Sequence, residues 1–390
     1  MMEEYMKFIH LGDIHLGKNL NEFSMIEDQK YILNEIINLI TKESVDAVLI
    51  AGDIYDRSIP SEEAVKLLDA FLTTMAEMGK KVFVIAGNHD SEERLHFGSK
   101  LFQANQIYIS GRYDGKIECI DVEDEYGVIH IWLLPYVKAS RVAHFYPDEV
   151  NMREGNTYNE AFKTAIGKCN INELERNIIL THQFVVGKSE EPELAGSENA
   201  SLSVGTIDKI SFECFDGFDY VAMGHIHSAQ MVGRETCRYA GSLLKYSLNQ
   251  REISKEKTVP IITMSEKGNV KVECFPLKPL REVRRIRGNL KDLIENAVDT
   301  EDYIYATLTD EVTQFDAMTR LQEVYPNTMK LDYDNRSTRA ILESEGEIET
   351  EGKGFQELML DFYKLMNGTE PSEEEWSILK EVAEEAGIIE

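Results

Sequence analysis

The sequence predicts a layered α/β sheet domain, followed by a small α+β domain and a C-terminal pair of helices. Up to about residue 278, short apolar runs typical of buried strands alternate with amphipathic segments typical of helices. Five of the apolar runs end in a short polar motif, at the place where ligands gather in an open α/β sheet. We expect a sheet domain at residues 1–278, a capping domain at 279–344, an acidic linker at 345–354 and a helix-loop-helix at 355–390.

The five polar motifs stand in a fixed order along the first domain. They are Asp13-Ile14-His15, Gly52-Asp53-Ile54-Tyr55-Asp56-Arg57, Gly87-Asn88-His89-Asp90, Thr181-His182-Gln183 and Gly224-His225-Ile226-His227. Residues two apart in extended backbone point to the same side. We therefore expect Asp13 with His15, and His225 with His227, to reach one ion cluster.

The residue types in these motifs suit a pair of divalent cations. Two neighbouring cations need a carboxylate that bridges them and a mixed set of nitrogen and oxygen ligands, with positions left open for water and a phosphate oxygen. The motifs contain five of the nine histidines, together with Asp13, Asp53 and Asn88. The sequence therefore predicts a two-metal phosphoesterase site.

The motif set resembles that of the calcineurin-like metallophosphoesterases. Within them, residues 8–17 and 239–243 are similar to the nuclease subunits of the Mre and SbcCD family of DNA double-strand-break enzymes, over roughly residues 6 to 280. This resemblance implies a DNA exonuclease and endonuclease that cleaves phosphodiester bonds at duplex ends or hairpins. It leaves open the polarity of cleavage and how a partner ATPase controls it.

The resemblance also implies a role for each polar residue. The metal ligands would form two sets and a bridge: Asp13, His15 and His227; Asn88, His182 and His225; and Asp53 between them. Manganese is the metal it favours, although the residues alone admit iron, zinc or magnesium. His89 would donate a proton to the leaving oxygen or stabilise charge on the phosphate, and a metal-bound hydroxide would be the nucleophile.

Four further residues are candidates near the motifs. Asp56 and Asp90 are expected to support the site, because carboxylates behind a metal ligand orient a histidine or a water. Arg57 matches the position at which related phosphatases grip phosphate. Ser242 lies in a segment that lines the active-site groove in the resembled family, and both residues are predicted to contact substrate.

The formal net charge of −29 opposes binding to duplex DNA, since that affinity comes largely from Lys and Arg that neutralise phosphates. Residues 345–390 hold fourteen acidic and three basic residues, so −11 of the total lies there. A basic run contains Lys278, Arg281, Arg284, Arg285, Arg287 and Lys291. It is either a DNA-facing strand or an edge strand protected by charge. We expect weak DNA binding by this chain alone and a partner that adds positive surface.

Composition is that of a cytoplasmic enzyme. No stretch approaches about 18 uninterrupted apolar residues, and no basic region leads into an apolar segment at the start, so we expect neither secretion nor a membrane span. The cysteines are odd in number and include no Cys-x-x-Cys pair: Cys119, Cys169, Cys214, Cys237 and Cys274. We expect reduced thiols, without a disulfide framework or a cysteine metal site.

Two surfaces are expected to bind other chains. A helix beginning after Ser61 has an apolar stripe, which in the resembled family contributes to a homodimer interface. The two C-terminal amphipathic helices need a surface to cover. The matching region of the resembled family docks on the coiled-coil base of an SbcC-type ABC ATPase, and the alternative is that the helices fold back on the capping domain.

Two other functions stay open at this level. A protein or small-molecule phosphatase would use the same metal ions, but it would not need the cap and the tail helices. A noncatalytic dimeric scaffold for the ATPase would tolerate loss of the ligands, and all seven are present. Cleavage assays on DNA and on small phosphoesters discriminate among these functions.

Overall fold

The computed structural model describes residues 5–150, 157–188, 191–198, 209–336, 355–367 and 370–385. These residues belong to two compact units, Met1–Arg281 and Glu282–Glu390. The predicted acidic linker at 345–354 lies outside the described residues, as do Glu190 and residues 199–204 of the long loop that the sequence predicts at 190–204.

The first unit is built on two six-stranded sheets among its described residues. The strands of the first sheet are, in spatial order, β16 (Val270–Pro276), β15 (Thr258–Met264), β1 (Met6–Leu11), β4 (Ala47–Ala51), β5 (Lys81–Ile85) and β6 (Ile107–Ser110). Those of the second sheet are β13 (Gln230–Val232), β14 (Arg234–Tyr239), β12 (Tyr220–Gly224), β9 (Arg176–His182), β8 (Gly127–Leu134) and β7 (Glu118–Asp124). Strands β1, β4, β5 and β6 run parallel, as do β8, β9, β12 and β14.

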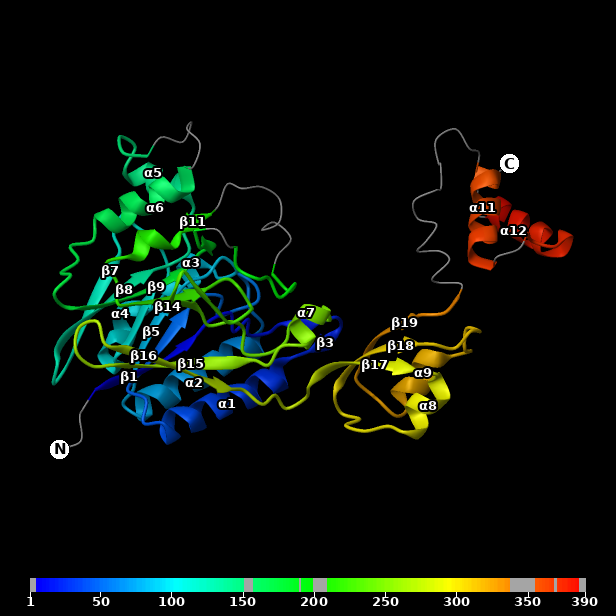
Figure 1. Cartoon of the computed structure of the whole chain (residues 1–390), viewed down its shortest axis with the longest axis horizontal. Helices are drawn as coiled ribbons and strands as arrows, with labels where there is room; N and C mark the ends of the chain where they lie inside the picture. The colour runs from blue at the N-terminus through cyan, green and yellow to red at the C-terminus, as the bar shows by residue number, and fades with distance from the viewer. Residues whose placement is uncertain are drawn as a thin grey trace. The chain divides into compact units, whose positions relative to one another are not determined.

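The two sheets face one another, and helices cover their outer faces (Figure 1). The helices are α1 (Ile26–Lys42), α2 (Glu62–Glu77), α3 (Glu92–His96), α4 (Ser99–Phe102), α5 (Ala139–Phe145), α6 (Thr157–Gly167) and α7 (Gln250–Ile253). Short pieces complete the unit: β2 (Asn19–Leu20), β3 (Phe23–Ser24), β10 (Val185–Val186), β11 (Ile210–Ser211) and the 3₁₀ turns Gln103–Asn105 and Phe212–Phe215.

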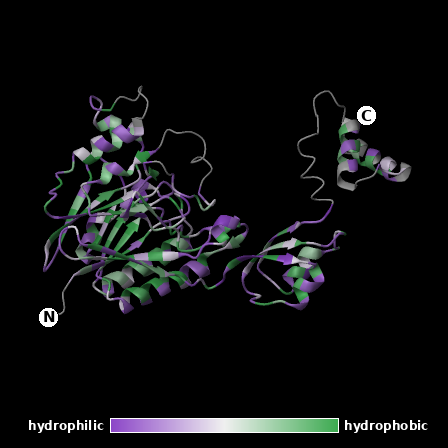
Figure 2. Cartoon of the chain, viewed as in Figure 1, coloured by the Kyte–Doolittle hydropathy of each residue, from purple (hydrophilic) through white to green (hydrophobic). Residues whose placement is uncertain are grey.

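Hydrophobic side chains fill the space between the sheets. Phe8, Leu49 and Phe83 from the first sheet pack in one cluster with Ile131 and Leu180 from the second. Alternate residues of these strands face the covering helices, because successive side chains point to opposite faces. Figure 2 shows the hydrophobic colour along the inner strands. Strands buried on both faces read as continuous apolar runs, which is why the sequence located them.

The start of helix α2 confirms its sequence-based boundary. The side chain of Ser61 accepts a hydrogen bond from the Ala64 backbone N–H at 3.2 Å, and Glu62 and Glu63 stand in the first turn. This cap satisfies one of the free N–H groups at a helix start. Along the stripe, Leu68 is buried and Val65 is exposed.

The second unit contains a small three-stranded parallel sheet among its described residues. Its order is β17 (Val283–Gly288), β18 (Tyr303–Leu308) and β19 (Thr328–Tyr333), with helices α8 (Leu290–Glu295) and α9 (Ala317–Gln322) in the connections. Helices α11 (Phe355–Asn367) and α12 (Glu373–Glu385) follow. Within the described residues, no helix combines the length and the apolar character that crossing a bilayer requires.

The basic run of the sequence is largely neutralised by neighbouring acids. Arg284 pairs with Asp302 at 2.7 Å, and Arg287 pairs with Asp334 at 2.6 Å. In the first unit, Arg281 pairs with Asp28 at 2.9 Å. Strand β17 is an edge strand of its sheet. These contacts favour the interpretation of the run as a charged edge over a free DNA-binding stripe.

Candidate metal centre

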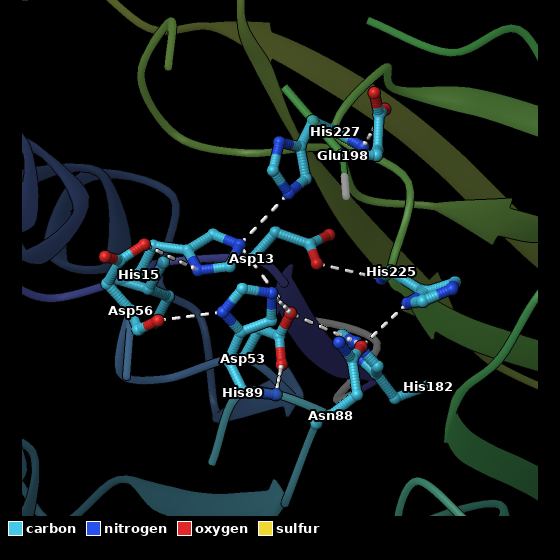
Figure 3. A network of polar contacts seen from close by, with 12 residues as sticks. Asp13, His15, Asp53, Asp56, Asn88, His89, His182, Glu198, His225 and His227 are labelled. Atoms are coloured by element: carbon cyan, nitrogen blue, oxygen red, sulfur yellow. Dashed lines mark hydrogen bonds and ion pairs between the residues drawn. The ribbon is translucent and has the colours of Figure 1, made fainter. Parts of the chain in front are cut away.

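All five polar motifs meet at one edge of the sandwich. The motifs of Asp13, Asp53 and Asn88 follow the adjacent parallel strands β1, β4 and β5, and those of His182 and His225 stand at the ends of β9 and β12. The carboxyl ends of parallel strands lie at the same edge of a sheet. The loops after β1, β4 and β5 therefore lie near the loops after β9 and β12. Figure 3 shows the side chains converging from both sheets.

The sequence-based expectation that extended backbone points these side chains to one side is wrong. Strand β1 ends at Leu11, and Asp13 and His15 have φ of 50° and 49° rather than extended values. Asp53 has φ of 48° and His225 has φ of 101°. Non-glycine residues held at positive φ are strained by about 1–3 kcal/mol each and cluster at functional sites. Left-handed turns, rather than strand alternation, therefore aim these side chains at the centre.

The first ligand set comes together as predicted. The Nε2 atoms of His15 and His227 lie 3.0 Å apart. One ligand atom each from Asp13, His15 and His227 lie within 4.8 Å of one another, and all three residues are buried. Three such atoms around one point can hold a divalent cation.

The second set gathers around the side-chain oxygen of Asn88. Its Oδ1 lies 3.0 Å from Nε2 of His182 and 2.9 Å from Nδ1 of His225. The other ring nitrogen of His182, Nδ1, donates to the carbonyl oxygen of Ala51 at 2.8 Å, which leaves Nε2 as the ligand atom.

Asp53 lies between the two sets. Its Oδ2 is 3.6 Å from Nε2 of His15, in the first set, and 3.4 Å from Nε2 of His182, in the second. Its Oδ1 accepts the backbone N–H of His89 at 2.8 Å, which fixes the carboxylate orientation. This is the position that a bridging ligand occupies.

The electrostatics of the centre fit a bound dication. Asp13 is fully buried, and its Oδ2 has no hydrogen-bond partner among the described residues. Burial, with the neighbouring charge of Asp53, raises the pKa of Asp13 to about 7. An unpartnered buried carboxylate oxygen is costly unless a cation neutralises it. The residues present therefore fit a metal pair.

Three of the four ligand histidines are held in the neutral form that metals bind. Burial lowers the pKa of His15 to about 4 and, together with the charge of His182, lowers that of His225 to about 3. Burial also lowers the pKa of His227 well below its ordinary value. Burial acts in the same direction on His182, but the charges of Asp53 and Asp13 outweigh it and raise its pKa to about 9. A dication would replace that proton.

His89 lies beside the metal ligands, and one ligand atom each from His89, His15 and Asp53 lie within 4.8 Å of one another. Its Nδ1 donates to the carbonyl oxygen of Asp56 at 2.8 Å, which leaves Nε2 on the other side of the ring. That Nε2 lies 4.0 Å from Oδ2 of Asp53, and the ring lines the central cavity with a side chain 21% exposed. His89 has the access to solvent that His182 lacks.

Asp56 and Asp90 support the loops, as expected. Asp56 pairs with Lys18 at 2.7 Å and lies 3.7 Å from Nδ1 of His15. The carboxylate of Asp90 accepts backbone N–H groups of Ile54, Tyr55 and Gly87, at 3.1, 2.9 and 2.9 Å. Asp90 thereby joins the loop after β4 to the loop after β5.

Arg57 and Ser242 do not join this group of side chains. Arg57 is 78% exposed and lines a separate hollow with Leu16 and Pro60. Ser242 is buried; its hydroxyl donates to the Leu244 carbonyl at 2.8 Å and accepts from Lys257. These contacts give Ser242 a structural role. That Arg57 or Ser242 contacts substrate stays a prediction, and the location of neither side chain supports it.

Sequence reasoning missed several residues around the centre. Ser197 Oγ lies 2.7 Å from Nδ1 of His227, and Glu198 accepts the backbone N–H of His227 at 3.0 Å. Both come from residues 190–204, whose content of Glu, Ser, Gly and Asn predicts only a long loop. Lys18 and Tyr136 also line the cavity. No motif spacing links these residues to the histidines, so only the fold could identify them.

The fold and the site define a metal-dependent hydrolase of the layered α/β type. The calcineurin-like phosphoesterase model matches residues 6–229, and the SbcD C-terminal model, described as type 5 capsule protein repressor C-terminal domain, matches residues 279–367. The chain is 32% identical over 374 residues to the SbcD subunit of nuclease SbcCD from Staphylococcus epidermidis (strain ATCC 12228 / FDA PCI 1200), covering 93% of each chain. The chain belongs to the calcineurin-like phosphoesterases, in the branch of the SbcD nuclease subunits.

Among solved structures, a dimetal phosphatase from Danio rerio matches 70% of this chain and 99% of its own length. The sequence identity is 14% and the TM-score is 0.38.

Proposed function

We propose that this chain is the metal-dependent nuclease subunit of an SbcCD-like complex, hydrolysing phosphodiester bonds of DNA at duplex ends or hairpins. The observation that carries the proposal is the bridging position of Asp53 Oδ2, 3.6 Å from His15 Nε2 and 3.4 Å from His182 Nε2. It occurs in a chain that is 32% identical over 93% of its length to a nuclease subunit.

In this proposal one group of residues binds metal ions, and His89 donates a proton. Asp13, His15 and His227 would hold one divalent cation, Asn88, His182 and His225 the other, with Asp53 shared between them. When bound, the pair supplies Lewis-acid activation of water and of the phosphate group. Manganese suits this mixed imidazole, amide and carboxylate set.

His89 handles the leaving group in this proposal. Its Nδ1–H is held by the Asp56 carbonyl, so the ring presents Nε2 to the cavity at a fixed orientation. A protonated Nε2 can give its proton to the leaving oxygen of the scissile phosphodiester, or stabilise the charge that develops there. Lys18 lines the cavity and is paired with Asp56 at 2.7 Å, and its ammonium would give a further hydrogen-bond donor to the entering phosphate.

Partners complete the proposed assembly. An SbcC-type ABC ATPase would bind the helices α11 and α12, whose sequence is amphipathic, and would add the positive surface that this chain lacks at net charge −29. A homodimer would form through the apolar groove beside α2, lined by Val65, Leu72, Phe97 and Phe102. A cytoplasmic location agrees with DNA as the substrate.

The decisive experiment is cleavage of an end-labelled duplex and an end-labelled hairpin in manganese, with and without the ATPase subunit. Wild type is compared with His89→Ala and with His144→Ala, a matched control at a histidine outside the motifs. We expect His89→Ala to lose roughly 10²–10⁴-fold in rate, with manganese content unchanged, and His144→Ala to cleave like wild type. Turnover of a small phosphomonoester without DNA cleavage, even with the partner, would replace the nuclease by a metallophosphatase.

A further inference from the structure

A second cluster of metal-ligating atoms lies on the outer hairpin of the second sheet. Cys119 and Asp121 are two residues apart on β7, so their side chains share one face, and His130 on β8 is directly opposite Asp121 in the strand register. One ligand atom from each of the three lies within 4.8 Å of the others. None of them is among the described residues that line the cavity of the metal centre.

A fourth residue fixes the histidine ring. Glu175, just before β9, has its Oε2 2.8 Å from Nε2 of His130, and Asp121 Oδ1 is 2.7 Å from Nδ1 of the same ring. A carboxylate that holds one imidazole N–H leaves the other nitrogen as the ligand atom and sets the ring orientation, as it does behind metal-bound histidines in general. Nδ1 of His130 therefore faces Asp121 Oδ1, the same oxygen that Cys119 Sγ approaches at 3.7 Å.

We propose that Cys119 Sγ, the Asp121 carboxylate and His130 Nδ1 bind one divalent cation of the zinc class, with Glu175 orienting the ring. A sulfur, a nitrogen and an oxygen donor together suit zinc, cobalt or nickel, whereas magnesium and calcium prefer oxygen alone. Three protein ligands leave a fourth tetrahedral position for water. The site is thus distinct in chemistry from the metal centre, whose seven predicted ligands include no sulfur.

The geometry leaves room for the ion to enter. Asp121 Oδ1 is 3.7 Å from Cys119 Sγ, which is close to the separation of two ligands on one ion. To bind the same ion as His130 Nδ1, this oxygen must move a few tenths of an ångström away from that nitrogen. The Asp121 side chain is 64% exposed, so this movement meets little resistance. On binding, the thiol proton and any proton on Nδ1 leave to solvent, because the ligand forms are thiolate and neutral imidazole.

The proposal departs from the sequence-based expectation of no cysteine metal site, which was based on the lack of a Cys-x-x-Cys pair. Its ligands stand as Cys-x-Asp on one strand and a histidine nine residues beyond Asp121, a spacing that only hairpin pairing turns into a cluster. The ion would cross-link edge strand β7 to β8. Through Glu175 it would also hold the segment that leads into β9.

Cobalt(II) titration of the full-length protein tests the proposal, because a thiolate ligand adds a sulfur-to-cobalt charge-transfer band in the near ultraviolet. We expect that band in wild type and in Cys169→Ser, whose cysteine is a half-buried neighbour outside the cluster, and its loss in Cys119→Ser. Zinc should abolish the band by competition. Glu175→Gln should keep the band but weaken cobalt binding by roughly 10- to 100-fold.

A second measurement guards against a variant that misfolds. In wild type, zinc should protect Cys119 from iodoacetamide while exposed Cys274 reacts as before, with the sites read by peptide mass spectrometry. Absence of the band in wild type, or its persistence in Cys119→Ser, would overturn the proposal and leave only an ion-paired cluster. Equal alkylation of Cys119 with and without zinc would overturn it as well.

Discussion

The hydroxyl oxygen of Ser197 lies 2.7 Å from Nδ1 of His227. The Nε2 atom of the same ring points to Nε2 of His15, 3.0 Å away (Figure 3). The hydroxyl therefore holds one side of the ring while the other side faces the first set of predicted ligands. The adjacent Glu198 accepts the His227 backbone N–H, so one short segment fixes both ring and backbone of this ligand.

Removing the hydroxyl should weaken metal binding rather than the chemistry. We expect Ser197→Ala to lower manganese affinity by roughly 10- to 100-fold, because a metal-bound histidine loses its tautomer and orientation without the partner. Activity measured against manganese concentration should shift to higher metal while reaching nearly the wild-type rate at saturation. Ser197→Thr, which keeps a hydroxyl, should stay near wild type. A loss of rate that excess manganese does not restore would contradict this role.

The close approach of Gly224 to its neighbours predicts a sharp effect of one methyl group. A Cβ there would lie 2.0 Å from the carbonyl oxygen of Ala51 and 2.7 Å from Nδ1 of His182. Gly224→Ala must therefore break the hydrogen bond that orients His182. We expect it to destabilise the protein by about 1–3 kcal/mol and to reduce metal content.

Gly167 supplies the matched control for that substitution. It lies at the end of helix α6, is exposed, and has no heavy atom within 4 Å of an added Cβ. Gly167→Ala should be neutral or stabilise by about 0.5–1 kcal/mol, since alanine loses less entropy in a helix. Thermal melts and metal analysis of both variants test this difference. Equal effects of the two substitutions on stability and metal content would contradict the argument, because they would mean that the protein accommodates the added methyl group at Gly224 without cost.

The unpartnered carboxylate of Asp13 predicts that the metal-free protein is less stable than it could be. Its Oδ2 is buried without a hydrogen-bond partner among the described residues, and burial raises its pKa to about 7. Asp13→Asn removes a buried charge, so the metal-free variant should melt at or above the metal-free wild type.

Adding manganese should make wild type more stable than Asp13→Asn, the reverse of the order expected without metal. Wild type should gain about 2.7 kcal/mol at a metal concentration 100 times its Kd, and Asp13→Asn should gain far less. Calorimetry with and without chelator measures both. A variant that is less stable than wild type in chelator, or that gains as much from manganese, would refute the argument.

Much of the metal centre was predictable because its residues follow buried strands. Apolar runs located β1, β4, β5, β9 and β12, and the residue types after them suit two cations. The local path was not predictable: positive φ at Asp13 and His15 places them by turns that their spacing does not reveal. Nor could spacing find Ser197, whose only link to His227 is contact across the fold.

The same limit applies to the basic run. Its charge was visible in the sequence, but its neutralisation depends on acids brought close by folding, such as Asp302 beside Arg284 and Asp334 beside Arg287. The presence of both strands and helices in the second unit followed from local pattern. The charge on its surface depends on ion pairs between residues that are 18 and 47 positions apart in the sequence.

A buried ion pair behind the metal centre predicts a pH dependence of stability. Lys257 donates to Glu252 at 2.8 Å and to the carbonyl oxygen of His227 at 3.0 Å, and both side chains are buried. Burial by itself would raise the pKa of Glu252, but the charge of Lys257 and the hydrogen bonds outweigh it and bring the pKa below 4.5.

The sign of the effect follows from that lowered pKa. Ionised Glu252 is favoured in the folded state, so its contribution is fully present above pH 4.5, the ordinary pKa, and is lost as the pH falls through the lower folded-state value. Glu252→Gln should destabilise the protein by roughly 3–5 kcal/mol at neutral pH, because it leaves the Lys257 charge buried without a partner.

Denaturant unfolding of the metal-free protein at a series of pH values tests this. The difference in unfolding free energy between wild type and Glu252→Gln should shrink as the pH drops below 4.5, whereas the exposed Glu256→Gln should follow wild type throughout. A difference that stays constant across the acid range would mean that Glu252 stabilises the fold through packing and hydrogen bonds instead of its charge.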